Sequence, residues 1–361
     1  MSRTTPASSL GRHRRLSAGL AALALTAVGL AGCGDDSADA SSDGGGGVEV
    51  NLGYFPNLTH APALIAEHEG LFDDELDKIG STVQTQTFDS GSDTIEQLLG
   101  GSLDVTYIGP SPTLTAYAQS NGEAVRVISG VTSGGASLVA QPEIKSVDDL
   151  EGRTVATPGL ANTQDIAARA YFKEQGFTTD VEGGGDISVV PQDNSITVQQ
   201  FQQGKLDAAW VPEPYASILV EAGGEVLLDE AELWPNGEFV TTQILVRTDF
   251  LEENPEEVKA LLTANDAAID MTADDAENAK SIASDQLEEL TSAALPPAVL
   301  DSAWDKLTFT NDPLAETLQE DYDDAADLEL IEPIDDLAGL YDLDIVNELL
   351  ADEGKQEVQG L

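Results

Sequence analysis

Residues 103–117, LDVTYIGPSPTLTAY, contain a short β-rich run that leads directly into the start of a helix. The run 103–109 combines β-branched and aromatic residues, which predicts a strand. Ser111 has a side chain that caps helices and Pro112 suits the first helical position, so we expect the helix to begin there. Strand and helix in alternation build parallel sheets covered by helices. The stretch therefore predicts an α/β fold.

The same order of strand and helix repeats on both sides of this stretch. Toward the N-terminus, 48–55 alternates like a strand, and 61–72 has apolar residues at helical spacing. Toward the C-terminus, a second series of strands and helices begins near residue 137. From Pro255 onward the chain has the pattern of helices with few strands. These patterns predict two α/β lobes followed by a helical C-terminal part.

The predicted lobes are joined by two crossings of the chain, near 133–139 and near 238–245. Lobe 1 would then comprise 48–135 together with 243–361. Lobe 2 would comprise 136–242.

Several predicted strands end in loops that carry small polar residues before a helix. Asn57 and Thr59 precede the first helix, and Asn162 precedes a later one. In parallel sheets such helix starts emerge at the carboxyl edge, where ligands of open α/β sheets bind. Unpaired N–H groups there, helped by the helix dipole, can bind an anion without an arginine. The loops predict a site for a small anion, although each polar residue could equally serve only as a helix cap.

Segments along the chain resemble the substrate-binding proteins of ABC importers in the aliphatic sulfonate, nitrate and taurine group. The sharpest are LGYFPNLTHAPALIA (52–66) and FQQGKLDAAWVPEPYAS (201–217), and the likeness continues to LYDLDIVNELL (340–350). The resemblance implies the type II periplasmic-binding fold, in which two α/β lobes close on a small solute. By this resemblance, the positions that match the cleft are Asn57, Thr59, His60, Ser111, Ser133, Gly134, Asn162, Thr163 and Glu213.

Some of these positions allow two interpretations. Asp165 and Glu213 would repel a sulfonate unless they are turned away, and Glu213 could instead cap its helix or receive an ammonium group. His60 could donate to an anion or pack against the helix start. Trp210 and Tyr215 could stack on an organic ligand or fill a core, and we expect the core.

The N-terminal segment has the basic start and apolar run of a secretory signal. The run 16–30 is shorter than the ~20 apolar residues that a spanning helix needs. LAGC (30–33) resembles the lipobox of bacterial lipoproteins, which implies cleavage before Cys33 and lipid on its sulfur. We predict a signal peptide over 1–32 and a lipidated, flexible tether over 33–47, with an uncleaved anchor helix as the alternative. The predicted location is the extracytoplasmic face of the cell membrane, reached through this lipid anchor only.

The composition excludes several classes of function. The chain has 66 acidic and 16 basic residues and a formal net charge of −50, which repels nucleic acid. It contains no Walker-type loop, no HExxH helix and no GxSxG elbow. Its three histidines are too few for a His-rich zinc site. We expect a binding protein rather than an enzyme, without metal or cofactor.

The expected partners follow from the resemblance. They are a small-molecule anion and the permease and ATPase subunits of an ABC importer, and the binding protein itself is expected to be a monomer. Two alternatives stay open: a ligand-binding receptor for a sensor system, and a binder of a pyrimidine-type or other organic nutrient.

Overall fold

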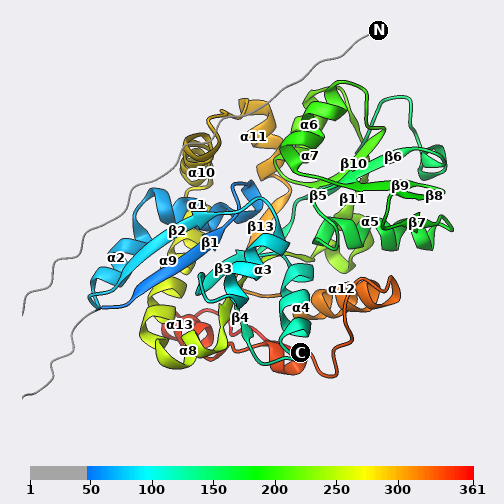
Figure 1. Ribbon diagram of the computed structural model, residues 1–361. Helices are drawn as coiled ribbons and strands as arrows, with labels where there is room; N and C mark the ends of the chain where they lie inside the picture. The colour runs from blue at the N-terminus through cyan, green and yellow to red at the C-terminus, as the bar shows by residue number, and fades with distance from the viewer. Residues whose placement is uncertain (1–46) are drawn as a thin grey trace, which may run out of the picture. The chain divides into compact units, whose positions relative to one another are not determined.

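The structure, a computed structural model, describes residues 47–361 (Figure 1). The predicted signal peptide, Cys33 and nearly all of the predicted tether lie outside these residues. Within the described part of the chain, no helix is both long enough and apolar enough to cross a membrane.

The strand and helix predicted from 103–117 are β3 (Val105–Ile108) and α4 (Pro110–Gln119). The helix begins before Ser111, with Gly109 as its N-cap residue. The prediction that Ser111 caps this helix is therefore wrong. Pro110 already fills the first helical position, where its missing N–H costs nothing and its fixed φ suits the helix.

Strand β3 belongs to a six-stranded sheet, the first sheet, with the order β13-β4-β12-β3-β1-β2. Strand β1 is parallel to both β2 and β3, whereas β12 is antiparallel to both β3 and β4. The other strands are β1 (Glu49–Tyr54), β2 (Thr82–Thr87), β4 (Val125–Gly134), β12 (Val240–Arg247) and β13 (Leu307–Phe309). The parallel trio places the carboxyl ends of β1, β2 and β3 at one edge.

Helices cover both faces of the first sheet (Figure 1). On one face, Leu52 and Tyr107 pack in an apolar cluster with residues of α1, α2, α9 and α10. On the other, Ile108 and Leu245 pack with residues of α3 and α4. These helices are α1 (Ala61–His68), α2 (Leu71–Asp77), α3 (Gly91–Leu99), α9 (Pro255–Asp274) and α10 (Ala276–Thr291). The C-terminal helices thus return to the sheet that the N-terminal strands began.

A second sheet has the order β11-β5-β10-β6-β9. Its strands are β5 (Ala136–Ala140), β6 (Thr154–Thr157), β9 (Ser188–Pro191), β10 (Ala208–Pro212) and β11 (Glu225–Asp229). Helices α5 (Thr163–Glu174), α6 (Asn194–Gln202) and α7 (Tyr215–Glu221) follow β6, β9 and β10. Strands β6, β9 and β10 are parallel neighbours, so these helix starts share one edge. The remaining elements include β7 (Thr179–Asp180), β8 (Gly184–Gly185), α8 (Thr248–Glu253), α11 (Pro297–Trp304), α12 (Ala315–Asp327) and α13 (Asp344–Asp352).

The chain passes from the first sheet to the second at Gly135, between β4 and β5, and returns between β11 and β12. Gly134 and Gly135 have φ values of 80° and 78°, a region that favours glycine. A side chain on Gly135 would also collide with that of Leu307. Glycine therefore permits this one-residue connection between two sheets.

Candidate ligand-binding cleft

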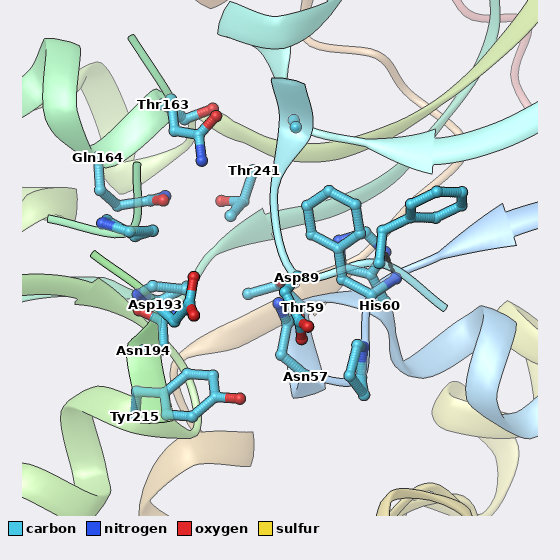
Figure 2. A pocket seen from close by; sticks show the side chains of 18 of the residues that line it. Asn57, Thr59, His60, Asp89, Thr163, Gln164, Asp193, Asn194, Tyr215 and Thr241 are labelled. Carbon is cyan, nitrogen blue, oxygen red and sulfur yellow. Dashed lines mark hydrogen bonds between the residues drawn. The ribbon is translucent and has the colours of Figure 1, made fainter. Parts of the chain in front are cut away.

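A cleft that is partly open to solvent lies between the carboxyl ends of strands from both sheets (Figure 2). The first sheet contributes residues that follow β1, β2 and β3, and the second contributes residues that follow β6, β9 and β10. The polar residues that line it are Asn57, Thr59, His60, Asp89, Asn162, Thr163, Gln164, Asp193, Asn194, Ser195, Tyr215 and Thr241. Strand ends of this kind are where open α/β sheets bind their ligands.

The start of helix α5 presents hydrogen-bond donors to the cleft. Asn162 is its N-cap residue, and its side chain makes no cap hydrogen bond. Within residues 47–361, the backbone N–H groups of Thr163 and Gln164 have no hydrogen-bond partner. The side chains of all three residues are at least 92% buried and form no hydrogen bond with other described residues. These unused groups are a ready anion site at the positive end of a twelve-residue helix.

His60 is a neutral donor in the opposite wall. Burial lowers its pKa to about 3, so the ring is uncharged near neutral pH. Its Nδ1 accepts a hydrogen bond from the backbone N–H of Phe55 at 3.2 Å, and the two rings stack with centroids 4.8 Å apart. The proton of the neutral ring therefore resides on Nε2. Beside it, the Thr59 hydroxyl donates to Asn57 Oδ1.

Two carboxylates, those of Asp89 and Asp193, also line the cleft, and among the described residues no lysine or arginine does. Tyr215 lies beside them in Figure 2, and burial together with the charge of Asp89 raises its pKa to about 12. Tyr215 also packs against the apolar cluster between the second sheet and its helices, so the expectation that it fills a core is confirmed only in part. It was right for Trp210, which is fully buried and donates to Glu230 Oε2 at 2.6 Å.

Four residues predicted for the site do not line the cleft. Ser111 is buried and donates to the carboxylate of Asp321 in α12. Ser133 Oγ accepts a hydrogen bond from the N–H of Phe239, and the carbonyl of Gly134 accepts one from Thr241. The structure thus places these side chains and this carbonyl in contacts that hold the strands and helices together.

Glu213, the fourth, is fully buried and faces away from the cleft. One of its oxygens accepts from the N–H of Ser217 at 3.0 Å, and the other lies 3.1 Å from Nζ of Lys306. Asp165 is also turned away, because it accepts hydrogen bonds from Thr157 and from Arg169 Nε at 2.9 Å. Neither acid is therefore positioned to repel an anion in the cleft.

Sequence reasoning missed Asp89, Gln164, Asp193, Asn194, Ser195 and Thr241. The signal for Asp193 and Asn194 was present, because they follow a predicted strand and precede a predicted helix, as Asn57 and Asn162 do. Gln164 is one residue beyond a predicted position on the same helix start.

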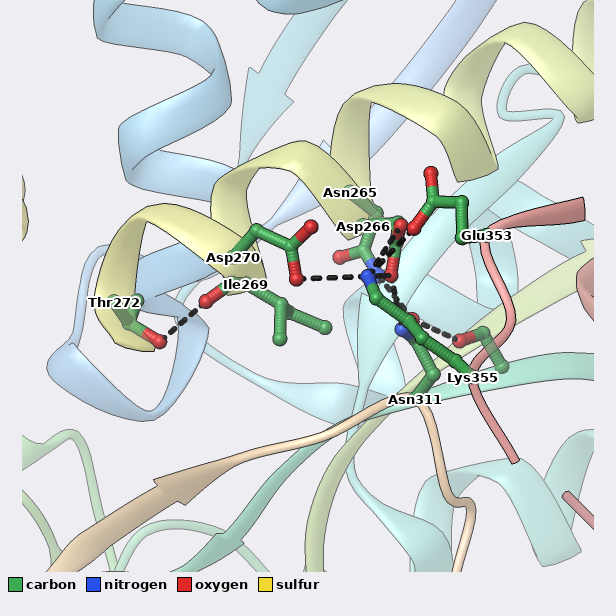
Figure 3. Close-up of polar contacts among 9 residues, drawn as sticks. Asn265, Asp266, Ile269, Asp270, Thr272, Asn311, Glu353 and Lys355 are labelled. Atoms are coloured by element: carbon green, nitrogen blue, oxygen red, sulfur yellow. Dashed lines mark hydrogen bonds and ion pairs between the residues drawn. The ribbon is translucent and has the colours of Figure 1, made fainter. Parts of the chain in front are cut away.

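A separate polar cluster lies on α9, away from the cleft (Figure 3). Nζ of Lys355 is 2.9 Å from a carboxylate oxygen of Asp266, 2.7 Å from one of Asp270 and 2.8 Å from one of Glu353. Asn311 donates to Asp266 at 2.6 Å. The three acids together could hold a metal ion, but here the ammonium group already lies among them. The cluster ties the C-terminal segment to α9.

Two β-sheets flanked by helices, with a polar cleft at their strand ends, are the architecture of periplasmic binding proteins. The chain belongs to the NMT1-like family, whose profile matches residues 44–285, more than half of its length.

Known proteins are similar to this chain. It is 29% identical over 213 residues to the taurine-binding periplasmic protein of Escherichia coli (strain K12), a match that covers 59% of this chain and 63% of that protein. The structure of the alkanesulfonate-binding protein SsuA from Xanthomonas axonopodis pv. citri, bound to MOPS, has a TM-score of 0.67 at 16% identity, covering 82% of this chain and 98% of that one. The nitrate-binding protein NrtA from Synechocystis PCC 6803 has a TM-score of 0.69 at 18% identity, covering 84% and 88%. The predicted family resemblance and the periplasmic-binding fold are confirmed.

Proposed function

We propose that the chain is the extracytoplasmic solute-binding lipoprotein of an ABC importer. It captures a small anionic solute in the cleft, an aliphatic sulfonate before nitrate or taurine, and delivers it to a membrane permease that works with an ATPase. The names of its taurine-, alkanesulfonate- and nitrate-binding relatives support this class of solute. The solute would prefer the closed arrangement of the two lobes and so stabilise it.

The observation that carries the proposal is the set of unused donors at the start of α5. The N–H groups of Thr163 and Gln164 and the side chains around them are buried without partners among the described residues. A ligand that accepts from these groups replaces water at them, and each hydrogen bond to a charged acceptor contributes about 1.5–3 kcal/mol net. The two backbone N–H groups can only donate, and their place at the positive end of the helix favours an anion.

The cleft supports binding rather than catalysis. His60 is the one histidine in the described lining, and its Nδ1 is already occupied by the N–H of Phe55. An activated nucleophile needs a base within hydrogen-bond reach. No such pair lines the described cleft.

The solute class is tested by thermal unfolding with alkanesulfonates, taurine, nitrate, sulfate and pyrimidines. A true ligand at 100 times its dissociation constant adds about 2.7 kcal/mol of stability. We expect sulfonates to give the largest shift. Stabilisation only by compounds that lack an acid group would overturn the anion proposal.

The site is tested by Gln164→Ala, with Ser111→Ala as the matched control. Both residues lie in the first turn of a helix that follows a strand, but Ser111 is committed to Asp321. Gln164→Ala should weaken solute binding about tenfold, or 1.4 kcal/mol. Ser111→Ala should lower stability and leave the affinity unchanged, and the reverse result would remove α5 from the site.

The anchor is tested by fractionating cells that express a Cys33→Ser variant. Loss of the thiol removes the acyl chains that hold the protein at the membrane, so the variant should be released into the medium. A variant that stays in the membrane fraction would favour an uncleaved helix instead.

A further inference from the structure

The cleft contains two carboxylates that the fold does not use. Asp89 and Asp193 are exposed in the cleft, and neither side chain forms a hydrogen bond with another described residue. Asp193 is the N-cap residue of α6, yet its side chain does not cap the helix. A capping role therefore does not account for this acid.

From these acids we infer that the solute is a zwitterion, with a cationic nitrogen that binds Asp89 and Asp193 and an acid group that binds the start of α5. The inference rests on the proposed function, in which an acid group of the solute binds the start of α5. It changes the preference among the solutes named there, because it favours amino-substituted acids such as taurine over simple anions. A simple anion in this cleft would meet two negative charges and, among the described lining residues, no compensating lysine or arginine. An ammonium group on the same molecule converts that repulsion into attraction.

The two carboxylates belong to different lobes. Asp89 follows β2 of the first sheet, and Asp193 follows β9 of the second. Closure of the cleft on a simple anion would bring two like charges closer together without a counter-charge. A cationic nitrogen between them would join the lobes, so closure would be favoured only with the complete ligand.

The groups of the cleft are arranged in two poles. In Figure 2, Thr163, Gln164 and Thr241 lie at the top of the view, Asp193, Asn194 and Tyr215 at the lower left, and Asp89 lies across from Asp193 beside Thr59. The ring of Tyr215 adds an aromatic surface to the acidic pole, and aromatic faces attract ammonium groups. One end of the cleft therefore fits an acid group and the other a cationic nitrogen.

The charge of the whole chain supports the same conclusion. A formal net charge of −50 creates a field that opposes the approach of any free anion. A zwitterion has no net charge, so this field does not repel it.

The test is calorimetric titration of the purified protein with matched pairs of ligands. Each pair has the same chain length and acid group, and carries either a terminal amino or a terminal hydroxyl group: 2-aminoethanesulfonate with 2-hydroxyethanesulfonate, and the corresponding phosphonates and carboxylates. For the acid group that binds, we expect the amino member to bind at least tenfold more tightly. Asp89→Asn and Asp193→Asn should each reduce that ratio at least threefold, whereas Asp148→Asn, an exposed acid outside the cleft, should not change it.

The outcomes separate the two proposals. Equal binding of the two members of a pair, or a ratio that survives both Asn variants, overturns the zwitterion and leaves the anion-binding function intact. Binding of simple alkylamines without any acid overturns the anion-binding function itself. If no pair binds at all, both proposals fall. Thermal unfolding of each variant without ligand verifies that it is folded.

Discussion

Four carboxylates stand near the strand ends that form the cleft, and they fall into two contrasting pairs. Asp165 and Glu213 are fully buried, and their oxygens accept hydrogen bonds and form ion pairs inside the fold. Asp89 and Asp193 are exposed in the cleft, and their side chains form no hydrogen bond within residues 47–361. All four occur next to a helix start, so this position does not decide what an acid does. The role of each acid depends instead on whether a cation lies within reach of a buried carboxylate oxygen.

The largest effect is expected from breaking the buried pair of Asp165 and Arg169. Both side chains are at least 98% buried, and Asp165→Asn would leave the guanidinium without its counter-charge. We expect a loss of about 3–5 kcal/mol in the free energy of unfolding, measured by denaturant titration. Replacing both residues together, Asp165→Asn with Arg169→Met, should recover part of that loss. A loss below about 1 kcal/mol in the single variant would contradict this assignment.

A smaller effect, and one that depends on pH, is expected from Glu230. Burial raises the pKa of this carboxyl to about 8, the Trp210 N–H partly opposes the rise, and the nearby Asp321 adds to it. In the unfolded chain the pKa of glutamate is about 4.3, so between these values the folded protein holds an extra proton. The stability that this group contributes is complete below about pH 4 and is lost as the pH rises through 8.

Glu230→Gln imitates the protonated acid and keeps an acceptor for Trp210. At pH 4 we expect the variant and the parent to unfold at similar denaturant concentrations. At pH 6.5, about two units above the pKa of the unfolded chain, the variant should be the more stable by about 2–3 kcal/mol, since each unit corresponds to about 1.4 kcal/mol. A difference that does not change with pH would show that this carboxyl does not titrate as described.

Glu213→Gln should cost less than the Asp165 variant. Gln keeps an acceptor for the N–H of Ser217 but loses the charge opposite Lys306, whose side chain is 23% exposed and partly compensated by water. We expect a loss of about 1–2 kcal/mol in the free energy of unfolding and no change in solute affinity. A loss of affinity at unchanged stability would return Glu213 to the binding site.

The smallest change in stability is expected for the two cleft acids, Asp89 and Asp193, although their proposed effect on binding is strong. Asp89→Asn and Asp193→Asn remove charges that have no described partner, so the free energy of unfolding should change by no more than about 0.5 kcal/mol. Denaturant titration of both variants without ligand checks this. A loss above about 1 kcal/mol would mean that these acids also serve the fold.

The fold was predictable from the sequence because it depends on patterns that repeat. Each strand that runs into a helix, such as 103–117, gives its own signal, and many such signals agree. The helix start was predicted two residues too late, because Ser111 and Pro112 were expected to open the helix, whereas Pro110 occupies its first position. The resemblance to known importers supplied the family, which the match over residues 44–285 confirms.

The cleft was only partly predictable. Asn57, Thr59, His60, Asn162 and Thr163 line it, and they were expected there. Ser111 and Glu213 have equally suitable positions along the chain, but their partners come from α12 and from Lys306, 210 and 93 residues away in sequence. A pattern of local residues carries no information about such distant partners. The roles of buried polar groups therefore required the structure.

The burial of His60 has a consequence for the surroundings in which the protein works. A ring with a pKa of about 3 keeps the same proton arrangement from mildly acidic to alkaline water. Outside the cytoplasm the acidity of the medium varies, yet this donor would present the same face to a solute throughout. A binding site that depends on this donor would keep the same hydrogen-bonding arrangement as its medium becomes mildly acidic.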